Sequence, residues 1–285
     1  MARRQKFAII TGCSQGGIGE ALALEYTRHG IFPIATVLPS EKSEHLSAAG
    51  ITWFPLDVTK NESISTLKQQ ITAVTGGFLD ILVNNAGITY TMTAADTDIS
   101  AVQDMFDVNV FGPMRMIHHF HDMLFASKGS VVNIGSVGGI VPYVYGSSYN
   151  ASKAALHHWS NTLRVEMAPL GVISGEIGTN ILKRDIHREL PIRSLFDPLR
   201  ENFKRHVTRT PATTDRVVYA KNVCMQSLSN CPPAWYWSGK TTGLVRFLDT
   251  FAWRGIWDVI FWRMFNLGKL QQARLTRDST SSTPY

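Results

Sequence analysis

Short apolar runs alternate with helix-like segments between residues 7 and 175, and this alternation limits the fold more than any other feature. The apolar runs predict strands at "KFAIITG", "FPIATVL", "ITWFPLDVT", "LDILVNNAG" and "GSVVNIGS". The segments between them carry the helical spacing of apolar residues. Strands that alternate with helices form βαβ units. We therefore expect an α/β fold, a Rossmann-type doubly wound parallel sheet with helices on both faces.

The chain of 285 residues suits one large domain with its own core. We expect this domain to cover residues 1–230, with helices on the substrate side from about residue 178. An aromatic C-terminal segment follows at residues 231–270. Residues 271–285, which end in "TRDSTSSTPY", predict a disordered tail.

The net charge of +6 admits nucleic acid, an anionic membrane surface or an anionic cofactor as partners. The cations form no basic stripe, which disfavours nucleic acid. The three cysteines lack disulfide or zinc spacing, so we expect a reducing compartment. Without a secretion signal or a long apolar stretch, we expect no spanning helix and a location on the cytoplasmic side. Five histidines lie in helical segments without a cysteine or acid at ligand spacing, which predicts packing or surface roles and no metal site: His118, His119, His121, His157 and His158.

A glycine-rich loop joins the first predicted strand to the first predicted helix. Glycines let the backbone approach a phosphate closely, and the helix N-terminus offers free N–H donors and a positive dipole. The strand–loop–helix context favours a dinucleotide phosphate site over an empty tight turn. Whether Gly16 or Gly17 is the middle glycine stays open, so the predicted contacts in "TGCSQGGIG" are Gly12, Ser14, Gly16, Gly17, Ile18 and Gly19.

Tyr149 and Lys153 lie one helical turn apart in "SYNASKAAL", so both side chains project from one helix face. A free tyrosine has a pKa of about 10. A neighbouring ammonium favours the phenolate and moves that pKa toward the working pH, as general acid–base catalysis requires. The alternative is a tyrosine–lysine pair on a solvated helix face.

These motifs together resemble the short-chain dehydrogenase/reductase family, in particular its fungal 1-acyldihydroxyacetone-phosphate reductase-like branch. The resemblance covers residues 7–180 and runs in order through "TGCSQGGIG", "LDVT", "NNAG", "NVFG", "IGS" and "YNASK". It implies hydride transfer between a nicotinamide and a carbonyl or alcohol, with Tyr149 as the general acid and base. The implied catalytic set is Asn109, Ser136, Tyr149 and Lys153.

The resemblance also assigns the supporting roles. Ser136 would hold the substrate oxygen against Tyr149. Asn109 would bend its helix and relay protons to Lys153, which we favour over the alternative of a side chain bonded to its own backbone. Asp57 and Val58 would flank the adenine. The cofactor would be lined by Asn84, Ala86 and Gly87, although a purely structural role at the strand end is equally open for them. Tyr149 and Lys153 would also contact the cofactor.

The cofactor's ribose selectivity depends on the end of the second strand. An acid there would bond the 2′-hydroxyl of NAD(H), and an arginine would accept the 2′-phosphate of NADP(H). Val37 and Leu38 occupy these positions, so neither marker is present. Ser40 and Lys42 are near enough to contact a phosphate. We therefore expect NADP(H) to be favoured over NAD(H).

The sequence departs from the family after the Tyr149 helix, where a sixth strand and a loop over the nicotinamide should follow. Only Val172 and Ile173 precede a loop-like "SGEIGTN", in which Gly175, Ile177 and Thr179 match the cofactor loop. Because a strand usually has about five residues, the sixth strand is predicted to be shortened. The alternative to an active reductase is thus a catalytically impaired or non-redox relative with a binding, cyclase or isomerase role.

The C-terminal segment holds most of the chain's seven tryptophans. Arg246, Arg254, Arg263 and Lys269 recur among them. Tryptophan with arginine suits a bilayer interface, and a substrate lid or a dimer contact are the alternatives. We favour a membrane surface, with the endoplasmic reticulum or lipid droplets as candidates and a lipophilic substrate. The family resemblance implies a homo-oligomer.

Overall fold

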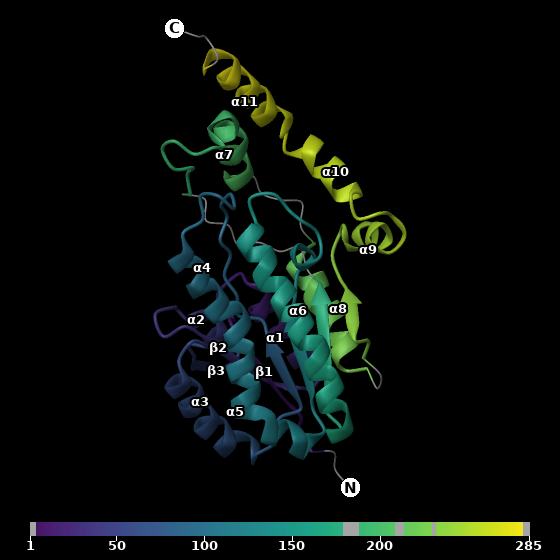
Figure 1. Ribbon diagram of the computed structural model, residues 1–285. Helices are drawn as coiled ribbons and strands as arrows, with labels where there is room; N and C mark the ends of the chain where they lie inside the picture. The colour runs from purple at the N-terminus through teal and green to yellow at the C-terminus, as the bar shows by residue number, and fades with distance from the viewer. Residues whose placement is uncertain (1–3, 179–187, 209–213, 230–231, 282–285) are drawn as a thin grey trace.

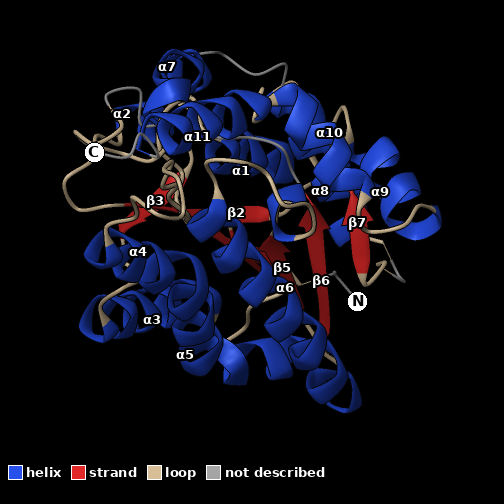
Figure 2. Ribbon diagram, turned by 45° about the horizontal axis from the view of Figure 1, so that its top comes forward, coloured by secondary structure: helices blue, strands red, loops and turns tan. Residues whose placement is uncertain are grey.

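One parallel sheet of seven strands organises the protein (Figures 1 and 2). The computed structural model describes residues 4–178, 188–208, 214–229 and 232–281. The strand order is β3-β2-β1-β4-β5-β6-β7, and each neighbouring pair is parallel. The strands are β1 (Phe7–Ile10), β2 (Phe32–Val37), β3 (Thr52–Pro55), β4 (Ile81–Asn84), β5 (Ser130–Ile134), β6 (Ile173–Gly178) and β7 (Trp235–Trp237).

Helices cover both faces of the sheet because side chains of a strand point alternately to opposite faces. Ala8 and Ile10 of β1 pack under α1 (Ile18–Arg28), α2 (Glu44–Ala48) and α8 (Arg216–Ser227). Ile9 faces the other way, toward α3 (Asn61–Thr75), α5 (Gly112–Ser127) and α6 (Ser147–Met167). The predicted doubly wound Rossmann-type fold is confirmed.

The chain reverses its direction of travel across the sheet between β1 and β4, which lie side by side. Ligands of such sheets bind outside the carboxyl ends of the strands at this switch point. The glycine loop follows β1, "NNAG" ends β4, and Ser136 follows β5. The topology therefore brings these three sequence motifs to one edge of the sheet.

The long helix predicted around Asn109 is divided. α4 (Ile99–Phe106) runs into a π-helical turn, Asp107–Phe111, before α5 begins at Gly112. A π turn inside an α-helix displaces the side chains it carries and is frequent at functional sites. Asn109 is buried in this turn, so the regular α-helix is interrupted at the residue for which a bend was expected.

The sixth strand is not shortened, contrary to the expectation. β6 spans six residues, Ile173–Gly178, and pairs with β5 from Ser130 to Ile134. The residues assigned to the cofactor loop supply the strand: Gly175 pairs with Val132, and Ile177 with Ile134. Thr179 lies outside the described residues.

The sheet also extends beyond the domain boundary expected at residue 230. β7 pairs with β6 through Glu176 and Trp235, so part of the aromatic segment belongs to the central sheet. The disordered tail expected from residue 271 is also wrong in part, because α11 spans Gly268–Ser281.

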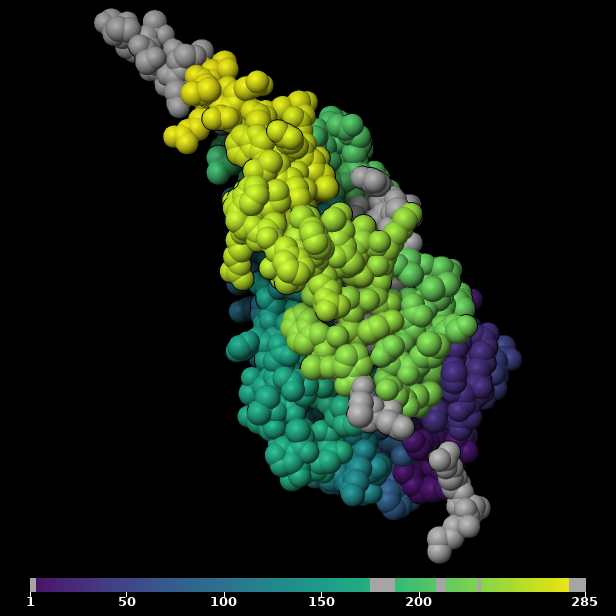
Figure 3. All heavy atoms as spheres, turned by 90° about the vertical axis from the view of Figure 1, so that its right-hand side faces the viewer, coloured from purple at the N-terminus to yellow at the C-terminus, as the bar shows by residue number. Residues whose placement is uncertain are grey.

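The C-terminal helices lie toward the carboxyl ends of the strands in Figure 1, and Figure 3 shows the C-terminal segment (yellow) at one end of the molecule. They are α9 (Thr242–Phe251), α10 (Ile256–Met264) and α11, and they follow β7 in the chain. The earlier helix α7 spans Arg200–Thr208. Val245, Trp257 and Phe261 are buried in a third hydrophobic cluster together with Tyr145 and Tyr149. The aromatic segment therefore covers the region where the predicted proton donor lies.

Candidate functional site

The glycine loop is held against the end of β4 by close backbone contacts. Gly12 has a φ of +71°, and a Cβ there would lie 2.9 Å from the Cα of Ala86. A Cβ on Gly19 would lie 2.5 Å from the Gly12 carbonyl oxygen. The Thr11 hydroxyl accepts hydrogen bonds from the backbone N–H groups of Asn85 and Ala86, each at 2.9 Å. Larger residues at Gly12 or Gly19 would thus force the loop and the strand end apart.

Gly16 and Gly17 both contribute to the loop, in different ways. Gly16 has a φ of +75°, a conformation that favours glycine. Gly17 caps α1 and bonds through its N–H to the Ser14 carbonyl at 2.9 Å; a Cβ on it would lie 2.9 Å from that oxygen. No side chain caps α1 at this end, so N–H groups of its first turn, which begins at Ile18, face the loop. This arrangement fits a dinucleotide phosphate.

Two carboxylates also contact the loop. Glu20 accepts hydrogen bonds from the Gly16 N–H and from Arg216, both at 2.8 Å. Glu41 accepts one from the Ser14 hydroxyl at 2.7 Å. The chain after β2 folds back and carries the Glu41 carboxylate to the glycine loop, although no acid stands at Val37 or Leu38. Lys42 beside it is exposed.

Asp57 and Val58 lie just beyond the end of β3. The Asp57 carboxylate accepts hydrogen bonds from the N–H and hydroxyl of Thr59, at 2.9 and 2.7 Å, and so forms the turn into α3. Val58 is buried and packs against Gly112, where a Cβ would lie 2.9 Å from it. The turn places both residues at the carboxyl edge of the sheet.

The two asparagines of the "NNAG" motif have different hydrogen-bond partners. The Asn84 side chain is buried and donates to Asn133 at 2.8 Å, which donates to Ser160 of α6 at 2.9 Å. Asn85, which the sequence did not single out, donates to the Thr11 and Gly12 carbonyls at 2.8 and 2.9 Å. Asn84 thus braces the strands, while Asn85 fixes the glycine loop.

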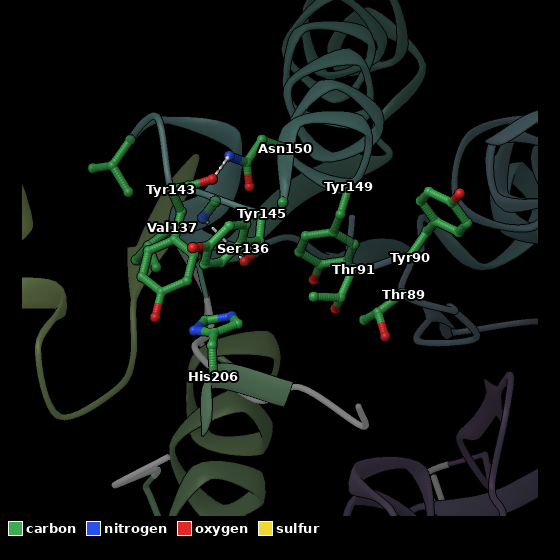
Figure 4. Close-up of a pocket in the computed structure, with 13 residues that line it drawn as sticks. Thr89, Tyr90, Thr91, Ser136, Val137, Tyr143, Tyr145, Tyr149, Asn150 and His206 are labelled. Atoms are coloured by element: carbon green, nitrogen blue, oxygen red, sulfur yellow. Dashed lines mark hydrogen bonds between the residues drawn. The ribbon is translucent and has the colours of Figure 1, made fainter. Parts of the chain in front are cut away.

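Ser136 and Tyr149 line a cavity at the end of β5 (Figure 4). The cavity measures about 50 Å³. Both residues are buried, at 4% and 8% exposure. The Ser136 hydroxyl accepts a hydrogen bond from the Gly138 N–H at 3.1 Å and lines the same cavity as the Tyr149 phenol. The rest of the lining is mainly aromatic and comprises Tyr90, Tyr143, Tyr145, His206 and their neighbours.

Burial raises the pKa of the Tyr149 phenol to about 12, and the neighbouring Ser136 hydroxyl opposes the rise. The expected lowering by Lys153 does not appear in this state of the protein. The Lys153 ammonium donates to the Ile134 carbonyl at 2.8 Å and lies 5.9 Å from the centroid of the Tyr149 ring. Below pH 12 the phenol therefore keeps its proton, as a proton donor must.

Asn109 and Lys153 approach each other at Gly87. A Cβ on Gly87 would lie 3.2 Å from the Asn109 amide oxygen and 3.8 Å from the Lys153 ammonium. The Asn109 oxygen accepts from the Ile88 N–H at 2.9 Å, and its nitrogen donates to the Ile88 carbonyl at 2.9 Å and the Ser152 hydroxyl at 3.1 Å. Asn109 therefore bonds the strand-end loop and α6, and not its own helix.

A second histidine, besides His206 of the cavity lining, contacts this site. The Ser136 N–H donates to His157 Nε2 at 3.2 Å, and His157 is buried. The only sequence signal for it is its position one helical turn beyond Lys153 on the same helix face. Within the described ranges, no group of three or more metal-ligating side chains is arranged to hold a metal ion. Over the same residues, no helix has the length and apolarity to cross a bilayer.

Comparison with known proteins agrees with this geometry. The short chain dehydrogenase family profile matches residues 6–191. The chain is 66% identical over 280 residues to the short-chain dehydrogenase virD of Hypocrea virens, covering 96% of this chain and 98% of that protein. It is 39% identical over 206 residues to an NADPH-dependent 1-acyldihydroxyacetone phosphate reductase of Schizosaccharomyces pombe, covering 69% and 70%.

A solved structure also resembles it. A short-chain dehydrogenase from Streptomyces avermitilis superposes with a TM-score of 0.74 at 25% identity, covering 94% of this chain and 99% of that one. The profile match, the relatives and the fold agree with the motifs from the glycine loop to Lys153. The protein belongs to the short-chain dehydrogenase family of NAD(P)-dependent oxidoreductases.

Proposed function

We propose that the protein is an NADP(H)-dependent reductase or dehydrogenase that interconverts a carbonyl and a secondary alcohol on a lipophilic substrate, such as a lipid or a natural-product intermediate. The observation that carries this proposal is the presence of Tyr149 and Ser136 in one aromatic cavity, at the edge of the sheet that also carries the glycine loop. A protonated phenol and a serine hydroxyl there suit one substrate oxygen.

The residues divide the chemistry as follows. A bound nicotinamide supplies or accepts the hydride. Tyr149 donates its phenolic proton to the carbonyl oxygen, and Ser136 holds that oxygen by a hydrogen bond. Lys153 and Asn109, brought together at Gly87, supply the route by which Tyr149 regains a proton. Donors that the fold holds in place need little reorganisation when the reaction occurs.

The glycine loop, together with Asp57, Val58, Ala86 and Gly87, would hold the dinucleotide. The name of the Schizosaccharomyces pombe relative, an NADPH-dependent reductase, supports NADP(H). Glu41 opposes this preference because its carboxylate bonds Ser14 of the loop. We keep NADP(H) as the proposed cofactor and expect its margin over NAD(H) to be small. Ser40, Lys42, Gly175, Ile177 and Thr179 stay predicted contacts.

Substrate has to enlarge the cavity, because pockets for ligands of ordinary size measure roughly 300–1,000 Å³. The cavity of about 50 Å³ is lined by His206, Tyr143 and Tyr145, and the two tyrosine rings contact the C-terminal segment. The Tyr143 and Phe265 ring centroids are 5.2 Å apart, and those of Tyr145 and Phe265 are 5.4 Å apart. These contacts also support the alternative of a lid, since moving α10 would open the cavity.

Cofactor binding and turnover test the proposal. NADPH and NADH are titrated by calorimetry, and NADPH oxidation is then followed with a panel of aromatic and aliphatic ketones and aldehydes. We expect both cofactors to bind, NADPH more tightly, and an apolar carbonyl to be reduced. Binding without any turnover across the panel would favour the impaired relative instead. β6 spans six residues, which supports the active reductase, but residues assigned to the cofactor loop form part of it.

We also propose that the outer face of α9 and α10 meets an anionic membrane surface. Leu244, Phe247 and Phe251 share one face of α9 and are 62%, 58% and 76% exposed. Trp253 and Trp262 add exposed indoles nearby. The exposed cations around them outnumber the exposed acids Asp249 and Asp258: Lys240, Arg246, Arg254, Arg263 and Lys269. Apolar area ringed by cations matches anionic headgroups over acyl chains.

Vesicle sedimentation tests the membrane proposal. We expect binding to vesicles that contain phosphatidylserine, weaker binding to phosphatidylcholine alone, and loss of binding in Phe247→Ser/Phe251→Ser. Ile192→Ser is the matched control, because Ile192 is 91% exposed but lies outside the C-terminal segment. If the wild-type protein does not sediment with either vesicle, the proposal is wrong. Light scattering of the free protein tests the predicted homo-oligomer.

A further inference from the structure

The packing around Ser136 involves a strand that lies far away in sequence. We propose that His157 is a positioning residue for Ser136, and that Trp235 of β7 fixes His157 in that role. The inference rests on the proposed function, in which Ser136 holds the substrate oxygen. It adds two residues that the motifs of the family resemblance do not contain.

The His157–Ser136 hydrogen bond has a fixed direction. A backbone N–H can only donate, so Nε2 of His157 accepts and carries no proton. Ser136 is only 4% exposed, so water cannot easily replace the imidazole as the acceptor. An unpaired buried N–H is costly. Without the imidazole, the backbone at Ser136 would therefore move to find another acceptor, and the hydroxyl would move with it.

The imidazole is held between two neighbours. A Cβ on Gly139 would lie 2.6 Å from its Cε1 atom, so the ring needs a glycine there. On another side the ring meets Trp235 edge-to-face, with centroids 5.1 Å apart at 79°. The Trp235 indole N–H in turn donates to Asn161 of α6 at 2.7 Å.

These contacts join β7 to the proposed reaction centre. Trp235 contacts His157, His157 accepts a hydrogen bond from the backbone of Ser136, and Ser136 lines the same cavity as Tyr149. A role of His157 in filling space alone would need the ring but not the accepting nitrogen. The acceptor is therefore the feature that a test must isolate.

The test compares His157→Leu, which removes the acceptor, with His157→Gln, whose amide oxygen can restore it. We measure kcat and KM with 9,10-phenanthrenequinone and NADPH, the Kd for NADPH, and exchange of the Ser136 amide by NMR. We expect His157→Leu to lower kcat about tenfold, to leave the Kd unchanged and to speed exchange at Ser136. His157→Gln should bring kcat and the rate of amide exchange at Ser136 most of the way back to the wild-type values. His158→Leu is the matched control, because His158 is the exposed neighbour.

A double variant separates this inference from the proposed function. If His157 acts through Ser136, adding His157→Leu to Ser136→Ala should lower kcat no further. Slow, unchanged exchange at Ser136 in His157→Leu would overturn the inference, even if the probe is not reduced. If His157→Leu has the wild-type kcat and Ser136→Ala has a low kcat, the role of His157 is overturned and the role of Ser136 stands. Wild-type kcat in Ser136→Ala would instead overturn the proposed role of Ser136.

Discussion

Gly19→Ala is the sharpest test of the glycine loop, because the added methyl group has no space. Its carbon would lie 2.5 Å from the Gly12 oxygen, 2.9 Å from the Asn85 amide nitrogen and 3.0 Å from the Cys13 Cα. Two of these three atoms belong to the backbone, so the loop itself must shift. Overpacking of this kind costs about 1–3 kcal/mol. We expect the free energy of unfolding to fall by that amount.

The same shift should weaken cofactor binding, because it moves loop N–H groups away from the phosphates. At 1.4 kcal/mol for each factor of ten, the expected rise in the Kd for NADPH is about 5- to 150-fold. Calorimetric titration measures the Kd, and urea unfolding measures the stability. Gly243→Ala is the control: nothing lies within 4 Å of its added carbon, and alanine favours α9 by up to about 1 kcal/mol. A Gly19→Ala protein that binds NADPH like the wild type would refute this account of the loop.

Two further variants follow from the charges of the site. Glu41→Gln removes the carboxylate that bonds Ser14. Because a like-charge contact near 4 Å costs about 1 kcal/mol in water, we expect calorimetry to show a several-fold lower Kd for NADPH and little change for NADH. Equal changes for both cofactors would contradict this. Burial raises the pKa of the Cys13 thiol from 9.0 to about 12. Between pH 9 and 12 the folded state keeps this proton while the unfolded state loses it. The buried thiol therefore leaves the free energy of unfolding unchanged below pH 9 and lowers it progressively as the pH rises to 12. Cys13→Ser should therefore lose less stability than the wild type between pH 9 and 12, by a difference on the order of 3 kcal/mol in urea unfolding; parallel pH curves would show that the thiol does not titrate as expected.

Much of the fold follows from local sequence pattern. The alternation of apolar runs and helical segments predicted the parallel sheet, because each run carries its own spacing signal. β7 could not be found in this way. It has three residues, Trp235–Trp237, and is a strand only because β6 offers it a free edge. β6 was misjudged for a related reason, since residues with a loop-like pattern complete the ladder beside β5.

The candidate site shows the same contrast between residues in short motifs and contacts between distant segments. Gly12, Gly19, Ser136 and Tyr149 were predicted because short motifs carry them, and the structure brings them to one edge of the sheet. Contacts between distant segments were not predictable. Glu41 reaches Ser14 only through the fold of the chain after β2, and His157 reaches Ser136 only because α6 packs beside β5. The pKa of Tyr149 likewise depends on burial by the surrounding protein, which the Tyr149–Lys153 spacing does not contain.

Single-turnover reduction by Tyr149→Phe is the most direct measurement of the central claim, that a buried phenol donates the proton beside the dinucleotide site. The variant keeps the ring in its cluster and removes only the hydroxyl. With saturating NADPH and a carbonyl that the wild type reduces, we expect stopped-flow absorbance to show a loss of at least about 100-fold in rate, with the Kd for NADPH unchanged. A Tyr149→Phe protein that oxidises NADPH at the wild-type rate would contradict the claim.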